Sequence, residues 1–118
     1  MYQFMFLLLF FLWNQGISIA DTISATDKGK ELYLLYGCAL CHGRSGDGHG
    51  INSQNFDPPP TNFHNSQAYH HGTDWDSLRR SIQYGIKDDN SVMPSFEHIP
   101  PEELNQIISY LQSLQKKE

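Results

Sequence analysis

Long apolar runs, basic residues and alternating strand patterns are all scarce in this chain of 118 residues. The longest apolar run, Phe4–Trp13, has ten residues, whereas a helix that spans a membrane needs roughly 20. Eight lysines and arginines stand against thirteen acidic residues, which gives a formal net charge of −5. This balance argues against binding to nucleic acid or to an anionic membrane surface. No run alternates for long enough to predict a strand, so the sequence predicts an all-α fold with long loops.

The N-terminal segment is typical of a secretory signal peptide. Its apolar core falls within the roughly 7–15 residues expected, and the small residues Ser18 and Ala20 follow it. We expect cleavage after Ala20, so that residues 1–20 are removed and residues 21–118 form one domain. If the segment stayed in place, it would act as an anchor instead.

Three later segments have the periodicity of amphipathic helices: residues 24–36, about ten residues that end before Gly85, and a final segment that Pro100 and Pro101 open and that has Lys116 and Lys117 at its C-terminal end. Their ends are predicted by two capping boxes, a closing glycine and a pair of prolines, namely Ser24 with Asp27, Thr73 with Asp76, Gly85, and Pro100 with Pro101. Gly29 lies inside the first helix, where it marks either a frayed first turn or a close helix crossing.

Residues 43–73 have neither a helical nor a strand period, and they include three consecutive prolines at 58–60. A stretch of about thirty residues without regular structure is unusual in so small a domain. We therefore expect this loop to wrap around something other than polypeptide.

The sequence "CALCH" ends in three residues with metal-binding or redox chemistry, Cys38, Cys41 and His42. A structural zinc site would need a second ligand pair, and the adjacent His70 and His71 point in different directions. A thioredoxin-like dithiol belongs between a strand and a helix, and no strand is predicted here. A disulfide at this short separation is sterically awkward and leaves His42 without a role.

The spacing Cys-x-x-Cys-His is the signature of covalent haem attachment. Two thiols two residues apart reach two vinyl groups on neighbouring edges of one macrocycle. The thioether bonds of Cys38 and Cys41 would then hold His42 beneath the iron as an axial ligand. Export agrees with this interpretation, because haem is attached outside the cytoplasm. We therefore predict one covalent haem c.

Met93 is the candidate for the sixth iron ligand, because it is the only methionine left once residues 1–20 are removed. It lies in the turn "SVMPSF", where Pro94 stiffens the chain, rather than on a helical stripe that would suggest a core position. The rival ligands are the other histidines of the mature chain: His49, His64, His70, His71 and His98.

The motifs "CALCHGRSGDGHG", "SIQYGI", "MPSF" and "LNQIISYLQSL", in that order, resemble a bacterial class I c-type cytochrome over Asp27–Leu114. The resemblance implies a cytochrome c-like fold of short helices and long loops around one haem. It also implies that the first and last helices cross closely at Gly29, Tyr33 and Tyr110, and that a proline carbonyl orients His42. We assign that carbonyl to Pro60, with Pro58 and Pro59 as alternatives. Candidates for binding the haem propionates are Trp75, Arg79, Arg80 and Arg44.

The resemblance implies a periplasmic one-electron carrier and not an enzyme. Its partners would be a respiratory reductase or dehydrogenase and a terminal oxidase or reductase, docked transiently. One alternative is a haem c subunit of a larger membrane-bound redox complex. Another is a ligand-binding or catalytic haem protein with a labile sixth ligand, in which His49, His64 or His98 would act as a distal base.

Overall fold

The computed structural model describes residues 24–89 and 91–115. The expected signal peptide, residues 1–20, lies outside the described residues. The elements follow in the order α2 (Ala25–Leu35), α3 (Cys38–His42), η2 (Ser53–Asn55), η3 (Ser66–Ala68), α4 (Trp75–Tyr84), β1 (Ile86–Lys87), β2 (Val92–Met93) and α5 (Pro101–Leu114). Within these residues no helix is both long enough and apolar enough to cross a membrane.

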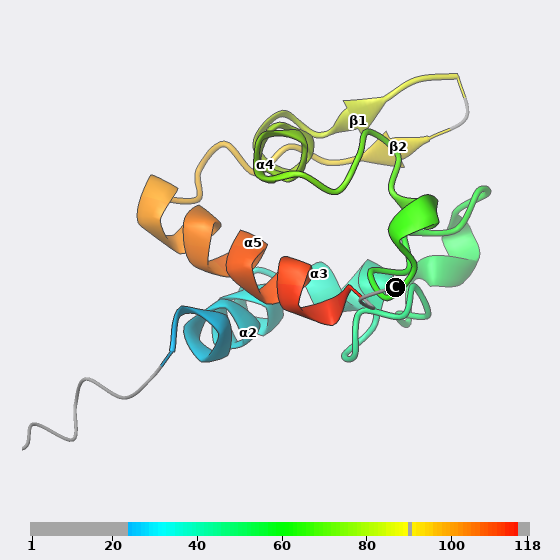
Figure 1. The fold of residues 1–118 in the computed structure, drawn as a ribbon. Coiled ribbons are helices and arrows are strands. Elements are labelled where there is room, and N and C mark those ends of the chain that lie inside the picture. Colours follow the sequence, from blue (N-terminus) through cyan, green and yellow to red (C-terminus); the bar gives the residue numbers. More distant parts are fainter. Residues whose placement is uncertain (1–23, 90, 116–118) are drawn as a thin grey trace, which may run out of the picture.

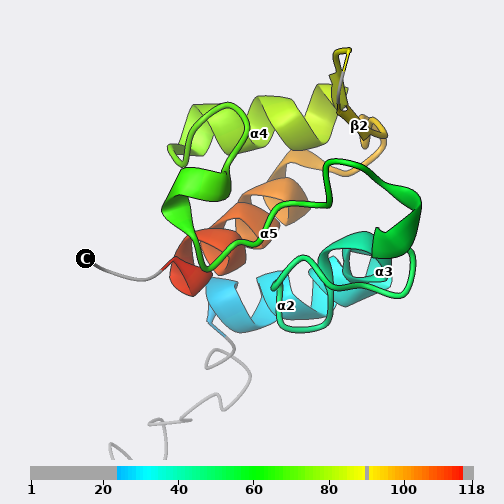
Figure 2. The ribbon, with the colours of Figure 1, turned by 90° about the vertical axis from the view of Figure 1, so that its right-hand side faces the viewer.

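Helices α2 and α5 lie against each other in both views (Figures 1 and 2). Gly29 makes this approach possible, because a Cβ built there would lie 1.9 Å from the backbone oxygen of Gln106. One turn further along α2, the ring of Tyr33 meets the ring of Tyr110 edge to face at 5.3 Å. The close crossing of the first and last helices at Gly29, Tyr33 and Tyr110 is confirmed.

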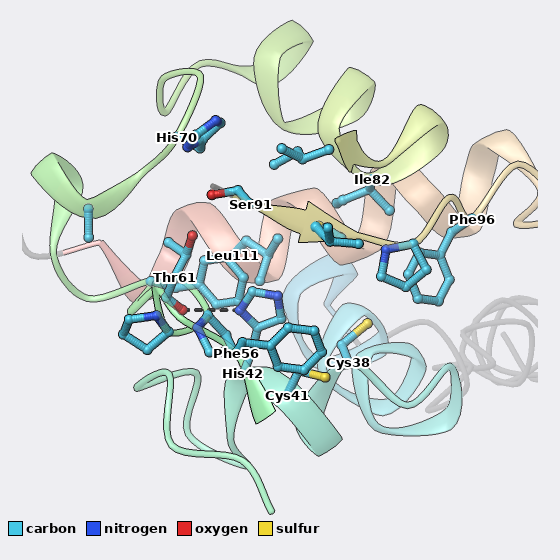
Figure 3. Close-up of a pocket in the computed structure, with 18 of the residues that line it drawn as sticks. Cys38, Cys41, His42, Phe56, Thr61, His70, Ile82, Ser91, Phe96 and Leu111 are labelled. Atoms are coloured by element: carbon cyan, nitrogen blue, oxygen red, sulfur yellow. Dashed lines mark hydrogen bonds between the residues drawn. The ribbon is translucent and has the colours of Figure 1, made fainter. Parts of the chain in front are cut away.

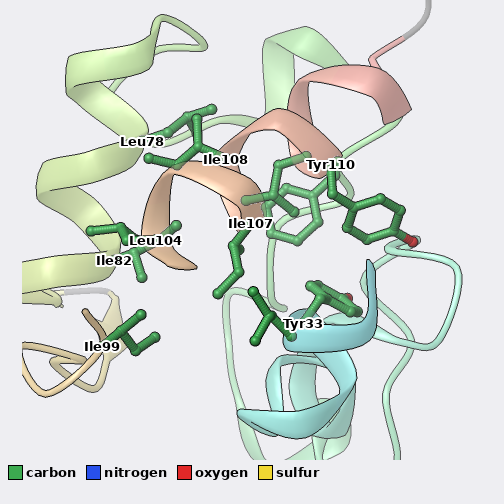
Figure 4. Close-up of a cluster of buried hydrophobic side chains, with 11 residues drawn as sticks. Tyr33, Leu78, Ile82, Ile99, Leu104, Ile107, Ile108 and Tyr110 are labelled. Atoms are coloured by element: carbon green, nitrogen blue, oxygen red, sulfur yellow. The ribbon is translucent and has the colours of Figure 1, made fainter. Parts of the chain in front are cut away.

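The hydrophobic core fills the space between α2, α4 and α5 (Figure 4). Leu78 and Ile82 of α4 face α5, where Ile108 is fully buried. The other buried apolar side chains are Leu32, Tyr33, Phe63, Ile99, Leu104, Ile107, Tyr110 and Leu111. The core therefore packs α2, α4 and α5 against one another in fixed positions.

The predicted helix ends are mostly confirmed. The Ser24 hydroxyl accepts a hydrogen bond from the amide of Asp27, and Pro100 precedes the first residue of α5. Gly85 ends α4 with φ +74°, a left-handed value that favours glycine. The start of α4 differs from the prediction by one residue: Asp74, not Thr73, is the cap, and its carboxylate accepts from the amide of Ser77.

The expectation that the chain has no strands is corrected by one small feature. Strands β1 and β2 form an antiparallel pair in which Ile86 faces Met93 and Lys87 faces Val92. Each strand has two residues, which is too short to produce an alternating pattern in the sequence. Between His42 and α4, the described chain forms only the short turns η2 and η3, so the predicted long loop without regular structure is confirmed.

Candidate haem-binding site

Helix α3 carries the Cys-x-x-Cys-His residues and lies directly beyond the end of α2 (Figure 2). The residue that caps its C-terminal end, Gly43, is fixed to α2, because the hydroxyl of Tyr33 donates to the carbonyl of Gly43 at 2.6 Å. Burial raises the pKa of Tyr33 far above its ordinary value, so this hydroxyl keeps its proton at neutral pH. The attachment motif is therefore anchored to the most tightly packed part of the fold.

Both cysteines are free thiols and are partly buried, so the structure contains no disulfide between them. Burial raises the pKa of Cys38 to about 11, because the thiolate would lose its hydration. Cys38 is consequently a neutral thiol at physiological pH. Both side chains line the same cavity as His42.

The imidazole of His42 is oriented by two neighbours in the segment that follows the prolines. Its Nδ1 lies 3.1 Å from the carbonyl oxygen of Thr61, and its ring stacks on Phe63 at 4.5 Å with an angle of 28°. Burial lowers the pKa of His42, partly offset by the bond to Thr61, so the ring is neutral near pH 7. A neutral ring that donates from Nδ1 has its lone pair on Nε2, and this nitrogen is free to bind a metal.

The carbonyl that orients His42 belongs to Thr61 and not to Pro60, the residue expected from the resemblance. The carbonyl of Pro60 instead faces Gly48, where a built Cβ would lie 2.7 Å from it. Successive carbonyls in an extended segment point in different directions, so a shift of one residue exchanges their roles. The expected interaction is present, but it comes from the next residue.

A cavity of about 320 Å³ lies between α3 and the β1–β2 hairpin (Figure 3). Cys38, Cys41 and His42 line it from α3, and Met93 lines it from β2. The rest of the lining is mostly apolar and includes Phe56, Phe63, Ile82, Phe96, Ile107 and Leu111. The structure therefore brings together all four residues that the sequence indicated as haem anchors and iron ligands.

Most of the other residues considered for the site lie away from this cavity. Of the rival histidines, His70 is part of the described lining, whereas His49, His64, His71 and His98 are not. Both ring nitrogens of His64 contact carbonyl oxygens, those of Ser45 at 2.7 Å and Leu114 at 3.0 Å. The suggested propionate ligands Trp75, Arg79, Arg80 and Arg44 do not line it either.

Residues 26–115 match the family described as Cytochrome c. The chain belongs to the cytochrome c family. None of the curated proteins matches it. Among solved structures, it resembles a chain of the reducing HAO-like protein complex of Kuenenia stuttgartiensis, with 27% identity and a TM-score of 0.61. That match covers 75% of this cytochrome and 42% of the other chain, so this protein spans less than half the length of its structural relative.

The donor set fits the cofactor of this family, covalently attached haem c. Two free thiols, a neutral imidazole with an available Nε2 and an apolar cavity are what the attachment requires. Among the described residues, no three or more His, Cys, Asp or Glu side chains are grouped so that they could hold a metal ion. Thr61 and Phe63 are the site residues that the sequence did not reveal.

Proposed function

We propose that this cytochrome is a one-electron carrier of the bacterial class I type, in which His42 and Met93 bind the haem iron. The observation that supports this most directly is the position of the two side chains. His42 lines the cavity from α3 and Met93 lines it from β2, with α3 and the hairpin on different sides of it in Figure 3. When bound, the haem supplies an iron that alternates between the ferric and ferrous states.

The protein's own residues would orient the iron ligands and set the reduction potential. Thr61 fixes the orientation of the His42 ring, and such a hydrogen bond raises the donor strength of Nε2. A thioether ligand from Met93 raises the reduction potential relative to a second histidine. The apolar side chains around the cavity disfavour the extra positive charge of the ferric state.

The expected location is the periplasm, with residues 1–20 removed during export. The short apolar run near the N-terminus supports this proposal. The partners would be a respiratory reductase or dehydrogenase and a terminal oxidase or reductase. Exposed apolar side chains on α3 and β2, Leu40 and Val92, would contribute to a docking surface near the haem. Such contacts are transient and bury less than about 1,200 Å².

A second candidate function is that of a haem subunit within a larger redox complex. The similarity to a chain of such a complex favours it, as does the fact that this chain covers 42% of that one. Intact mass of the purified protein distinguishes the two functions. Loss of residues 1–20 together with one added haem supports the free carrier. A mass that retains residues 1–20 supports an anchored subunit.

Optical spectroscopy of the ferric protein tests the ligands. We expect a sulfur-to-iron charge-transfer band that disappears in Met93→Ala, because residues 21–118 contain no other methionine. The unmodified ferrous protein should not bind carbon monoxide readily. If it does bind carbon monoxide, the sixth site is open, and the carrier proposal gives way to a ligand-binding or catalytic haem.

A further inference from the structure

Three polar side chains of the cavity lining lie together at one end of the cavity. In Figure 3, Thr61, His70 and Ser91 lie on one side of the cavity, and Cys38 and Cys41 lie on the other. His70 comes from the loop after η3, and Ser91 directly precedes β2. The cavity therefore has a cysteine end and a polar end.

The positions of the vinyl and propionate groups on haem indicate which group lies at each end of the cavity. The two vinyl groups stand on neighbouring pyrrole rings, and the two propionates stand on the remaining two rings. Thioether bonds to Cys38 and Cys41 thus fix the vinyl edge at the cysteine end of the cavity. The carboxylates must then lie toward the other end, where burial without a polar partner would be costly.

We propose that His70 is the residue that binds a haem propionate. It has the only side chain in the described lining, apart from His42, that can carry a positive charge at neutral pH. Ser91 adds a hydroxyl at the same end of the cavity. The proposal depends on covalent haem at Cys38 and Cys41, and it does not depend on Met93 as a ligand.

A contact with the hairpin turn already orients His70. Its Nε2 lies 2.5 Å from Oδ2 of Asp88, and the amide of Asp88 donates to the carbonyl of Ser91 at 3.0 Å. This arrangement uses Nε2 and leaves Nδ1 for a propionate oxygen. The ring nitrogens of His70 would then contact two carboxylates, that of Asp88 and that of the propionate. The ring centre of His71 lies 4.5 Å from that of His70, and the charged residues Lys87 and Asp89 flank Asp88 in the sequence.

The residues suggested by sequence are in worse positions for this role. Arg79 lies outside the cavity lining, and its guanidinium contacts Gln83 at 3.0 Å and Asp76 at 3.6 Å, both on its own helix. Trp75 is at the start of α4, and it too is outside the lining. His70 therefore replaces Trp75 and Arg79 as the candidate propionate ligand.

The test compares His70→Leu with His71→Leu in the haem-loaded protein. A cation beside a propionate offsets its negative charge, and this charge otherwise stabilises ferric iron. His70→Leu should therefore lower the reduction potential and shift the propionate bending band in the resonance Raman spectrum. His71→Leu should change neither, because His71 is exposed and does not line the cavity. His70→Lys supplies a cationic hydrogen-bond donor at the same position, so it should recover most of the potential.

The variant Asp88→Asn distinguishes propionate binding by His70 from a purely structural contact between His70 and the hairpin. If His70 binds a propionate, this variant removes a competing carboxylate, and the potential should rise while the Raman band of the bound propionate remains. If His70 only ties the hairpin to the loop, Asp88→Asn and His70→Leu should act alike, and the propionate band should stay unchanged in both. A potential that falls in His70→Leu without any change in that band would also overturn the proposal. The charge-transfer band of the unmodified protein reports on Met93 separately, so failure of either proposal is recognisable.

Discussion

The carbonyl of Thr61 accepts a hydrogen bond from Nδ1 of His42 at 3.1 Å, and this contact decides which nitrogen of the ring is free to bind iron. The ring of Phe63, two residues further along the chain, stacks on the imidazole ring of His42. The amide of Phe63 donates to the carbonyl of Gly46 at 2.8 Å. Residues 61–63 thus hold the His42 ring through a backbone carbonyl and a side chain. The same segment is bonded to the loop that follows the Cys-x-x-Cys-His motif.

Phe63→Ala should destabilise the protein and loosen His42. Phe63 is 7% exposed and packs between His42, Tyr33 and Tyr69. Removing a buried phenylalanine costs about 3–5 kcal/mol of unfolding free energy. Denaturant unfolding measures this, and the His42 resonances of the ferrous protein should broaden. Ile51→Ala is the control, since Ile51 is 83% exposed and its loss should stay within about 0.5 kcal/mol.

Gly29→Ala should lower stability, although alanine is the better helix former. In an exposed helix this change would gain up to about 1 kcal/mol. Here the new Cβ would fall 1.9 Å from the oxygen of Gln106, so α2 and α5 must separate. Overpacking of this kind costs about 1–3 kcal/mol. The thermal unfolding midpoint of Gly29→Ala measures this loss of stability. Lys30→Ala is the control, because Lys30 is exposed on the same helix. A midpoint equal to or above that of the unmodified protein would contradict the close crossing.

Tyr33→Phe should remove the tie between α2 and the end of α3. The variant removes one of two donors to the carbonyl of Gly43, because the amide of Gly46 also donates to it at 3.1 Å, so the loss should be about 0.5–1.5 kcal/mol. A pH dependence follows from the raised pKa of Tyr33. Below about pH 10 the tyrosine is protonated in both states. Above it only the unfolded chain releases this proton, so the stability of the unmodified protein falls as the pH rises.

Denaturant unfolding between neutral and alkaline pH measures the difference between the two proteins. The advantage of the unmodified protein over Tyr33→Phe should be constant up to about pH 10 and should shrink above it. Tyr84→Phe is the matched control, because Tyr84 is 59% exposed. An advantage that grew with pH would contradict the assigned role of burial.

Asp74 should stabilise the start of α4 only while it is ionised. Its carboxylate accepts from the hydroxyl and the amide of Ser77, and these bonds lower the pKa of Asp74. A lowered pKa means that the stabilisation is present above the ordinary value of about 3.9 and is lost as the pH falls below it. Asp74→Asn keeps a capping oxygen without the charge, and Asp74→Ala removes the cap.

Thermal midpoints recorded from acid to neutral pH give the comparison. Asp74→Ala should be the least stable protein at neutral pH. The difference between the unmodified protein and Asp74→Asn should narrow below about pH 4, where the carboxylate takes up its proton. If that difference stayed constant through the acid range, the carboxylate would not be the group responsible.

Local patterns in the sequence predicted the features that adjacent residues encode. Cys38, Cys41 and His42 lie within five consecutive residues, and the ends of α2, α4 and α5 depend on caps within one turn of the chain. The glycine inside the first helix left a frayed turn and a close crossing both open, and the resemblance to c-type cytochromes favoured the crossing with Tyr33 and Tyr110. Met93 was indicated as the only methionine outside residues 1–20, and the structure places it at the cavity.

The features that the sequence did not predict depend on contacts between distant residues. The choice between Pro60 and Thr61 depends on the rotation of one peptide unit, and residues 58–61 have no periodicity that could fix it. Trp75 and Arg79 have suitable donors, but the burial of Leu78 and Ile82 turns a different face of α4 inward. The approach of His70 to Asp88 joins two loops, and neither loop contains a pattern that indicates the other.

The two walls of the cavity are held with very different strength. The wall with His42 is continuous with the α2–α5 crossing through Tyr33 and Phe63, which belong to the buried core. The wall with Met93 is a pair of two-residue strands at the margin of the fold. Regions with few buried contacts open locally at a lower free energy than the whole molecule unfolds. Amide hydrogen exchange should therefore show the hairpin opening well before α2 and α5, so that the protein can release one side of its cavity while the other remains folded.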